Sequence, residues 1–163
     1  MSPPEIFDPA LRTLRFQRAA RATPEDRWLV ERMAEELSIR LMPVKRGFSD
    51  VLLIGQGLDL LAVSPLLAGA TITRLDAHAP GGLQEDRTNF GLACYDLVIA
   101  CGTLDSVNDL PGALILMRRA LRPGGLFLAS MVGAGSLPAL RLPMSAADRH
   151  ETTSVARFHP LVD

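Results

Sequence analysis

A glycine-containing turn directly after an apolar run is the part of this sequence best suited to bind a ligand. Residues 51–54 are four apolar residues, and Gly55, Gln56 and Gly57 follow at once. A strand followed by G-x-G is how an α/β domain presents backbone groups to a nucleotide-like ligand. Glycine allows the main chain to approach the ligand where a Cβ atom would collide with it. The sequence therefore predicts a ligand-binding loop at these three residues.

The two cysteines offer less chemistry. Cys94 and Cys101 flank an apolar run, and a fully extended segment places residues seven apart roughly 23 Å from each other. That distance is too long for a disulfide, so we expect two reduced thiols. The sequence holds no CxxC motif and no Cys/His cluster, so it does not predict a zinc or other metal site.

Composition and charge indicate which class of protein this chain belongs to and which kinds of partner are not expected. The 163 residues predict a single domain, and 48% hydrophobic with 21% charged residues is typical of a globular one. The net charge of -1 gives no electrostatic reason to expect nucleic acid or an anionic membrane as partner. No apolar stretch reaches the roughly 18 residues of a spanning helix. Acidic Glu5 and Asp8 near the start argue against a signal peptide, so we expect a soluble, cytoplasmic protein.

Residues 1–48 are predicted to form a helical lead-in, and residues 49–163 the core of the single domain. Asp8 followed by Pro9 is a typical helix start, and Thr23 followed by Pro24 repeats that pattern. Apolar residues then recur at helical spacing as far as Pro43, and we expect them to face the core. They are Trp28, Leu29, Met33, Leu37 and Leu41.

The core alternates buried strands with helices. Strands are predicted at 51–54, 71–75, 96–101 and 126–130. A helix capped by Asn108 or Asp109 is expected to run to about residue 121, with a buried side formed by Leu114, Met117, Ala120 and Leu121. This alternation predicts a Rossmann-like, doubly wound parallel sheet of the α/β class.

Two segments depart from a regular alternation. Pro65 falls inside the helix expected at 60–68, so that helix is either kinked or begins afresh with Ser64 as its cap. Residues 77–94 leave room for little more than a loop, whereas a parallel crossover usually contains a helix. One helix, or a helix and a strand, is therefore expected to be missing there.

Three later segments carry a family resemblance. Residues 95–99 read YDLVI, residues 107–113 read VNDLPGA, and residues 117–127 read MRRALRPGGLF. Together they resemble class I S-adenosylmethionine-dependent methyltransferases. They are most similar to the subgroup that contains the biotin-pathway malonyl-carrier-protein methyltransferase and the mitochondrial complex I assembly factor that hydroxylates an arginine. Residues 6–8, 44–48, 135–141 and 157–160 also resemble that subgroup, so the similarity touches nearly the whole chain.

The resemblance implies S-adenosylmethionine as cofactor and methyl transfer to a small-molecule or protein acceptor that the sequence does not identify. It implies that Asp76 binds the ribose hydroxyls, for which a carboxylate is suited because it accepts two hydrogen bonds. It places Gln84 or Glu85 near the acidic position that contacts adenine. The predicted cofactor-binding set is Gly55, Gln56, Gly57, Asp76, Gln84, Glu85 and Cys101.

Three departures from the family pattern leave the function open. Leu53 stands where a carboxylate is frequent, Asp59 replaces the third glycine, and residues 103–106 replace a Leu-His-Trp run. Losing one charge-assisted hydrogen bond costs roughly 1.5–3 kcal/mol, or about 10- to 150-fold in affinity. Asp59 has the alternative role of capping the following helix. Two main hypotheses therefore stand: an active methyltransferase, or a catalytically inactive homologue that acts as a binding or assembly module. A nicotinamide or other nucleotide binder is the third, because the fold alone does not fix the function.

The family fold continues with further strands beyond the position of Asp163. The sheet is therefore expected to be incomplete, with the strand at 126–130 at an open edge. An unpaired edge strand invites pairing with another chain, so the sequence predicts either a truncated chain or closure of that edge by a partner, with a homodimer as the first case to test.

Overall fold

Four parallel strands form one sheet in the part of the chain that the structure describes. In this computed structural model that part is residues 5–133, 135–136, 138–139, 143 and 146. The strands are β1 (Asp50–Gly55), β2 (Thr71–Asp76), β3 (Tyr95–Cys101) and β4 (Leu121–Ser130), in the order β2-β1-β3-β4. The predicted Rossmann-like, doubly wound parallel sheet is confirmed.

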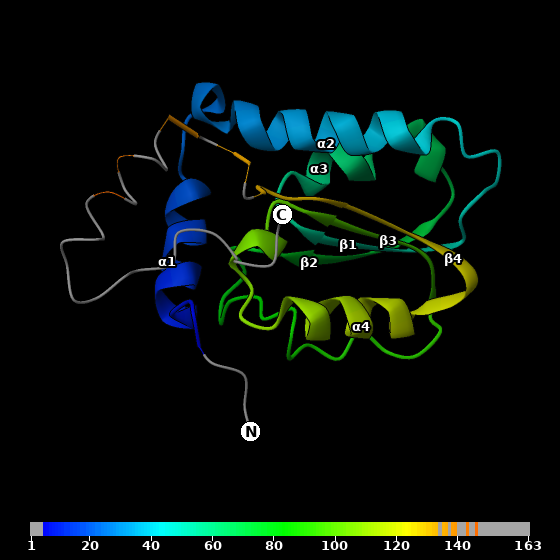
Figure 1. The fold of residues 1–163 in the computed structure, drawn as a ribbon. Coiled ribbons are helices and arrows are strands. Elements are labelled where there is room, and N and C mark those ends of the chain that lie inside the picture. The colour runs from blue at the N-terminus through cyan, green and yellow to red at the C-terminus, as the bar shows by residue number, and fades with distance from the viewer. Residues whose placement is uncertain (1–4, 134, 137, 140–142, 144–145, 147–163) are drawn as a thin grey trace.

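Helices cover both faces of this sheet. They are α1 (Pro9–Ala19), α2 (Trp28–Leu41), α3 (Leu58–Ala62) and α4 (Leu110–Ala120), with short 3₁₀ turns η1 (Pro24–Arg27), η2 (Pro65–Leu67) and η3 (Leu104–Ser106). Figure 1 shows α2 and α3 on one face, α4 on the other, and α1 at one end of the sheet. The helical lead-in therefore divides in two, and only α2 belongs to a layer against the sheet.

The residues of β1 explain why the sheet lies in the middle. Val51 and Leu53 pack in the core on the side of α2 and α3, whereas Leu52 and Ile54 pack in the core on the side of α4. All four side chains are fully buried. A parallel strand covered by helices on both faces has no polar side, so it reads as a continuous apolar run.

The two irregular segments behave as the sequence indicates. α3 ends at Ala62, and η2 begins afresh with Pro65 in its first position, while the Ser64 side chain accepts from the backbone N–H of Leu66. The segment between β2 and β3 contains turns but neither helix nor strand. The missing crossover helix is therefore confirmed, and Leu83 and Phe90 of this loop fill the core where it would pack.

Three residues expected in the core are exposed instead. Trp28 is 66% exposed and Leu29 is 42% exposed, because α2 touches the core through its later turns, at Ala34, Leu37 and Leu41. On α4 the expected Met117 and Ala120 are buried, but Ala113 rather than Leu114 faces the core, so Leu114 lies at the surface. The buried residues of α4 are Leu110, Ala113, Met117 and Ala120.

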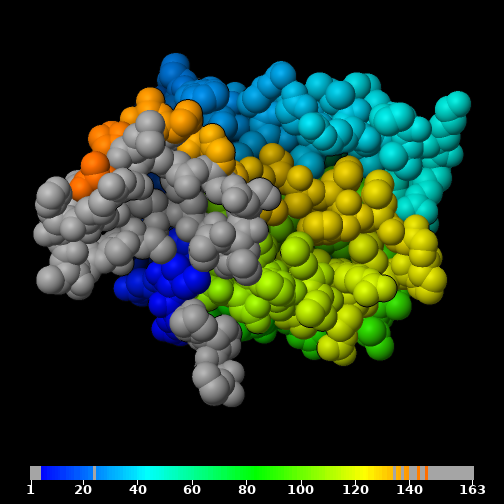
Figure 2. All heavy atoms as spheres, in the orientation of Figure 1, coloured from blue at the N-terminus to red at the C-terminus, as the bar shows by residue number. Residues whose placement is uncertain are grey.

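The sheet is open, as expected, and β4 lies at its edge with no further strand beside it among the described residues. In Figure 2 the atoms of β4 form the surface between α2 (blue to cyan) and α4 (yellow-green). Of the two later segments that resemble the family, 157–160 lies outside the described residues and 135–141 lies partly outside them. Within those residues, no helix has the length and apolar character required to cross a membrane.

Candidate functional site

The glycine turn lies where the chain reverses its direction across the sheet. β2 pairs with one side of β1 and β3 pairs with the other, so the carboxyl ends of β1 and β3 form a topological switch point, the usual ligand position in such sheets. The Gln56 backbone N–H donates to the Cys101 oxygen at 2.9 Å. Its side-chain Nε2 donates to the Gly102 oxygen at 2.8 Å. The turn is thus held against the end of β3.

Both glycines of the turn are surrounded by the protein itself. A Cβ atom on Gly55, whose φ is +111°, would lie 2.1 Å from the Cys101 backbone oxygen. A Cβ atom on Gly57, whose φ is +64°, would lie 2.9 Å from Cγ1 of Val30. Packing and backbone conformation therefore require glycine at both positions, whether or not a ligand binds. The sequence pattern did not reveal this structural reason.

Asp76 ends β2 directly beside Gly55 in the sheet register. Its side chain is 38% exposed, and its Oδ1 lies 2.7 Å from Nε2 of His78. That pair does not meet hydrogen-bond geometry, and Oδ1 itself is buried. The carboxylate is therefore placed at the carboxyl edge of the sheet, next to the glycine turn.

Glu85 lies deeper than a ligand-contacting residue usually does. Its side chain is completely buried, and its Oε1 accepts a hydrogen bond of 2.8 Å from Nη2 of Arg12. The same guanidinium donates to the backbone oxygens of Leu83 and Thr103 and to the Ser106 hydroxyl. Sequence analysis missed Arg12, because it belongs to a series of arginines at three-residue spacing that resembles a solvated helix face.

Gln84 lies beside this ion pair but does not join it. Its backbone oxygen accepts from the backbone N–H of Thr88 at 2.8 Å, and its side chain lines a narrow crevice with Arg12 and Asp86. The structure thus brings Glu85, rather than Gln84, into the buried polar cluster.

Buried oxygen atoms without a hydrogen-bond partner collect at this edge of the sheet. Within the described part of the chain they are Asp76 Oδ1, Glu85 Oε2 and Thr103 Oγ1. Each belongs to the end of β2 or to a loop that follows β2 or β3. A buried polar atom in a native fold is normally satisfied, and an exception indicates a missing water, ion or ligand. The residues present therefore fit a ligand that donates hydrogen bonds at this edge.

A cavity of about 200 Å³ opens beside the glycine turn. Gln56, Gly57, Asp59 and His78 line one side of it, and the chain around Asp26 lines the other. Sites for small molecules and cofactors typically measure roughly 300–1,000 Å³. The cavity is in the expected place but is small for a nucleoside-containing ligand.

The departures from the family pattern have structural explanations. Leu53 is fully buried in the core on the α2 side, so it does not face the cavity. Asp59 does not cap α3, which contradicts the capping alternative, since the N-cap residue is Gly57 and no side chain caps that end. Instead Asp59 Oδ1 lies 2.7 Å from Nη2 of Arg74 on β2, in an exposed ion pair.

Burial also controls two titratable groups near the site. It raises the pKa of the Cys101 thiol to about 11, so the thiol is protonated at neutral pH. Burial also raises the pKa of the Asp105 carboxyl, a change that its backbone N–H and Arg12 partly oppose. Cys101 is therefore a fully buried core residue at the end of β3, and its thiol is not nucleophilic.

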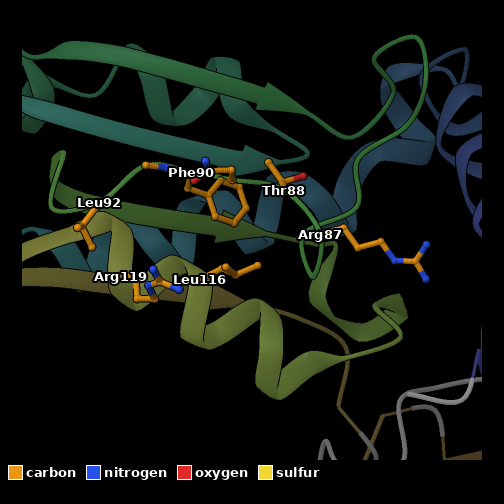
Figure 3. Close-up of a pocket in the computed structure, with 8 residues that line it drawn as sticks. Arg87, Thr88, Phe90, Leu92, Leu116 and Arg119 are labelled. Carbon is orange, nitrogen blue, oxygen red and sulfur yellow. Dashed lines mark hydrogen bonds between the residues drawn. The ribbon is translucent and has the colours of Figure 1, made fainter. Parts of the chain in front are cut away.

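A second cavity, of about 440 Å³, lies away from the glycine turn, between the loop at 87–92 and α4. Figure 3 shows Phe90, Leu92 and Leu116 around it, with Arg119 beside them and the Arg87 side chain pointing away. It contains none of the predicted cofactor-binding residues.

Comparison with known proteins agrees with this geometry. Residues 52–129 match a family model described as a methyltransferase domain. Residues 52–129 therefore carry a methyltransferase-like domain. The zebrafish protein named arginine-hydroxylase NDUFAF5, mitochondrial, is 39% identical over 136 residues, which cover 74% of this chain and 42% of the relative. The mouse protein of the same name is 27% identical over 172 residues, covering 95% of this chain and 49% of the relative.

The chain thus spans less than half the length of these curated relatives. Among solved structures, a Thermotoga maritima S-adenosylmethionine-dependent methyltransferase, described as a possible histamine N-methyltransferase, aligns with a TM-score of 0.47. It is 19% identical, and the alignment covers 83% of this chain and 68% of that one. The family assignment therefore rests on the sequence matches.

Proposed function

We propose that this methyltransferase-like domain binds S-adenosylmethionine at the carboxyl ends of β1, β2 and β3 and transfers its methyl group to an acceptor. The observation that supports this most is that buried oxygens of Asp76, Glu85 and Thr103 lie at that edge without a hydrogen bond, although Asp76 contacts His78. A ligand with several hydrogen-bond donors, such as a nucleoside with ribose hydroxyls, would satisfy them.

The chain's own residues would serve mainly to position the two reactants. Asp76 would accept from the ribose hydroxyls, Gln56 and Gly57 would form the wall beside them, and Glu85 would lie at the base end. The bound cofactor supplies an electrophilic methyl group, so the protein needs to orient the acceptor rather than provide an acid–base pair. Of the predicted set, Cys101 and Gly55 would shape the floor, and Gln84 would stay at the rim.

The acceptor class that we would test first is a protein-bound arginine. The relatives' name, arginine hydroxylase, supplies the reason to consider that side chain. Carboxylates of Asp26 and Asp59 line the cavity beside the glycine turn together with Arg27, and a guanidinium group of an acceptor would compete with Arg74 for Asp59. A small cationic molecule is the other acceptor that the same carboxylates would favour.

Calorimetric titration with S-adenosylmethionine and with its demethylated product tests this proposal. We expect micromolar binding that Asp76→Ala weakens roughly 10- to 150-fold, since one charge-assisted hydrogen bond is lost. Glu35→Ala, an exposed carboxylate on α2, is the matched control and should bind like the wild type. No binding at millimolar ligand would overturn the proposal.

The second candidate is a catalytically inactive homologue that serves as a binding or assembly module. Three observations favour it: the glycines are already packed by protein atoms, the cavity is small, and Arg12 covers Glu85. A stable fold that binds no cofactor in the titration would support this function. Retained folding must then be shown by a cooperative thermal transition of the same sample.

The partner and location of the chain stay predictions. We propose that the open edge of β4 pairs with a second copy, because its backbone groups have no strand beside them in the described structure. Size-exclusion chromatography with light scattering would show a dimer, or a monomer that contradicts the idea. We further propose a cytoplasmic location and no nucleic-acid or membrane partner, which imaging of a tagged chain and filter-binding assays would test.

A further inference from the structure

The Arg12 side chain makes more hydrogen bonds than any other side chain in the described part of the structure. Its Nε donates to Ser106 Oγ at 3.0 Å, and Nη2 donates to Glu85 Oε1 at 2.8 Å and to the Thr103 oxygen at 3.0 Å. Its Nη1 donates to the backbone oxygen of Leu83. The Arg12 side chain is only 10% exposed. All of its partners belong to the loops that follow β2 and β3.

The helix that carries Arg12 has little other attachment to the core. No residue of α1 is buried. Before the helix, the Asn108 side chain accepts from the backbone N–H groups of Ile6 and Phe7 at 2.7 Å and donates to the Phe7 oxygen at 2.9 Å. Apolar burial is the main force that holds helices to a core. Because α1 buries so little, polar contacts to two loops hold it in place.

Arg12 covers the oxygens that most need a partner. Glu85 Oε2 and Thr103 Oγ1 are buried without a hydrogen bond, although Arg12 binds the other oxygen of Glu85 and the backbone oxygen of Thr103. Glu85 is completely buried in this arrangement. A ligand therefore cannot reach either oxygen while α1 is docked.

We propose that Arg12 is an internal cation that plugs the Glu85 end of the cofactor site, and that α1 must lift before a ligand can use Glu85. This inference rests on the function proposed above. The structure then represents the closed form, and the small cavity beside Gly57 is what remains of the site when α1 is docked. Cofactor and Arg12 would compete for the same carboxylate.

Titration of four proteins with S-adenosylhomocysteine tests the plug. They are the wild type, Arg12→Ala, Asn108→Ala and the control Arg15→Ala, which removes an exposed arginine of the same helix. When only a fraction of molecules is competent, the apparent dissociation constant is the intrinsic constant divided by that fraction. We therefore expect about tenfold or greater tightening for Arg12→Ala. Asn108→Ala should tighten binding less, and Arg15→Ala should not change it.

Hydrogen exchange of the α1 amides in the wild type supplies the second readout. The plug predicts that ligand speeds exchange in residues 9–19, because the helix must lift. Slower exchange with ligand, or weaker binding by Arg12→Ala, would overturn the inference and make α1 a cover that holds bound cofactor. If the Arg12→Ala variant does not fold because Glu85 is left unpaired, the Asn108→Ala variant tests the inference instead, since it keeps the Arg12–Glu85 ion pair. Absence of binding in all four proteins would overturn both this inference and the proposed function.

Discussion

Replacing Gly55 by alanine tests whether the glycine turn is required by the fold rather than by a ligand. The new Cβ atom would lie 2.1 Å from the Cys101 backbone oxygen, a group that cannot turn aside as a flexible side chain can. The same oxygen accepts from the Gln56 backbone N–H at 2.9 Å. Any relief of the collision must therefore disturb the junction of β1 and β3.

The expected loss of stability has three parts. A non-glycine residue at positive φ costs roughly 1–2 kcal/mol, overpacking a tight site adds about 1–3 kcal/mol, and the weakened hydrogen bond adds about 0.5–1.5 kcal/mol. Gly55→Ala should thus lower the free energy of unfolding by about 3–6 kcal/mol. Gly69→Ala is the matched control: its φ is +83°, but nothing lies within 4 Å of its added Cβ.

Thermal and urea unfolding followed by far-ultraviolet circular dichroism measures the difference. Gly69→Ala should lose only the strain, about 1–2 kcal/mol. Gly47→Ala, which has neither positive φ nor a close neighbour, should be nearly neutral. At about 2–4 °C per kcal/mol for a chain of this size, the Gly55 variant should melt roughly 4–16 °C below the Gly69 variant.

Equal stability of the Gly55 and Gly69 variants would refute this reasoning. The close approach of Cys101 would then not constrain the turn, and the glycine would be free to serve a ligand alone. The test needs no cofactor, so it separates the structural requirement for Gly55 from the proposed function.

Further expected outcomes concern four titratable groups. The hydrogen bond from Arg122 chiefly lowers the pKa of Asp96, so the stability this carboxylate contributes is present above about pH 4 and is lost as pH falls through the lowered value. Asp96→Asn should therefore flatten the acid limb of a thermal-stability profile from pH 7 to 2. Burial raises the pKa of Asp105, so its ionised form is unfavourable at neutral pH. Asp105→Asn should raise the melting temperature at pH 7, with a gain that shrinks as pH falls toward about 4. Exposed Cys94 should react with a maleimide at pH 8 while Cys101 stays protected, giving one adduct in native buffer and two in urea by mass spectrometry.

Local patterns in the sequence predict the elements well, because their causes are local. The Asp8 side chain caps α1 through the backbone N–H groups of Ala10 and Leu11. Pro65 restarts a helical turn, and the apolar runs become parallel strands with both faces buried. Each outcome depends on the conformational limits and hydrogen-bonding capacity of a few adjacent residues.

Packing between residues far apart in the sequence determined the features that local sequence patterns did not predict. Trp28 matched the apolar period of α2 but lies beyond the turns that touch the sheet, so it is exposed. Asp59 looked suited to cap α3 but lies across the sheet edge from Arg74 and pairs with it instead. Neither result depends on neighbours in sequence, so no local pattern could reveal it.

In the candidate site, too, some features follow from the sequence and others only from the tertiary structure. The sequence alone indicated the glycine turn and the family resemblance, and that resemblance implied roles for Asp76 and for Gln84 or Glu85. Only the tertiary structure showed that a guanidinium 73 positions away in the chain lies on Glu85 and that Val30 lies on Gly57. Buried contacts between distant segments arise from how the layers pack. The family resemblance can thus be found in the sequence, whereas the position of Arg12 on Glu85 is decided by tertiary packing.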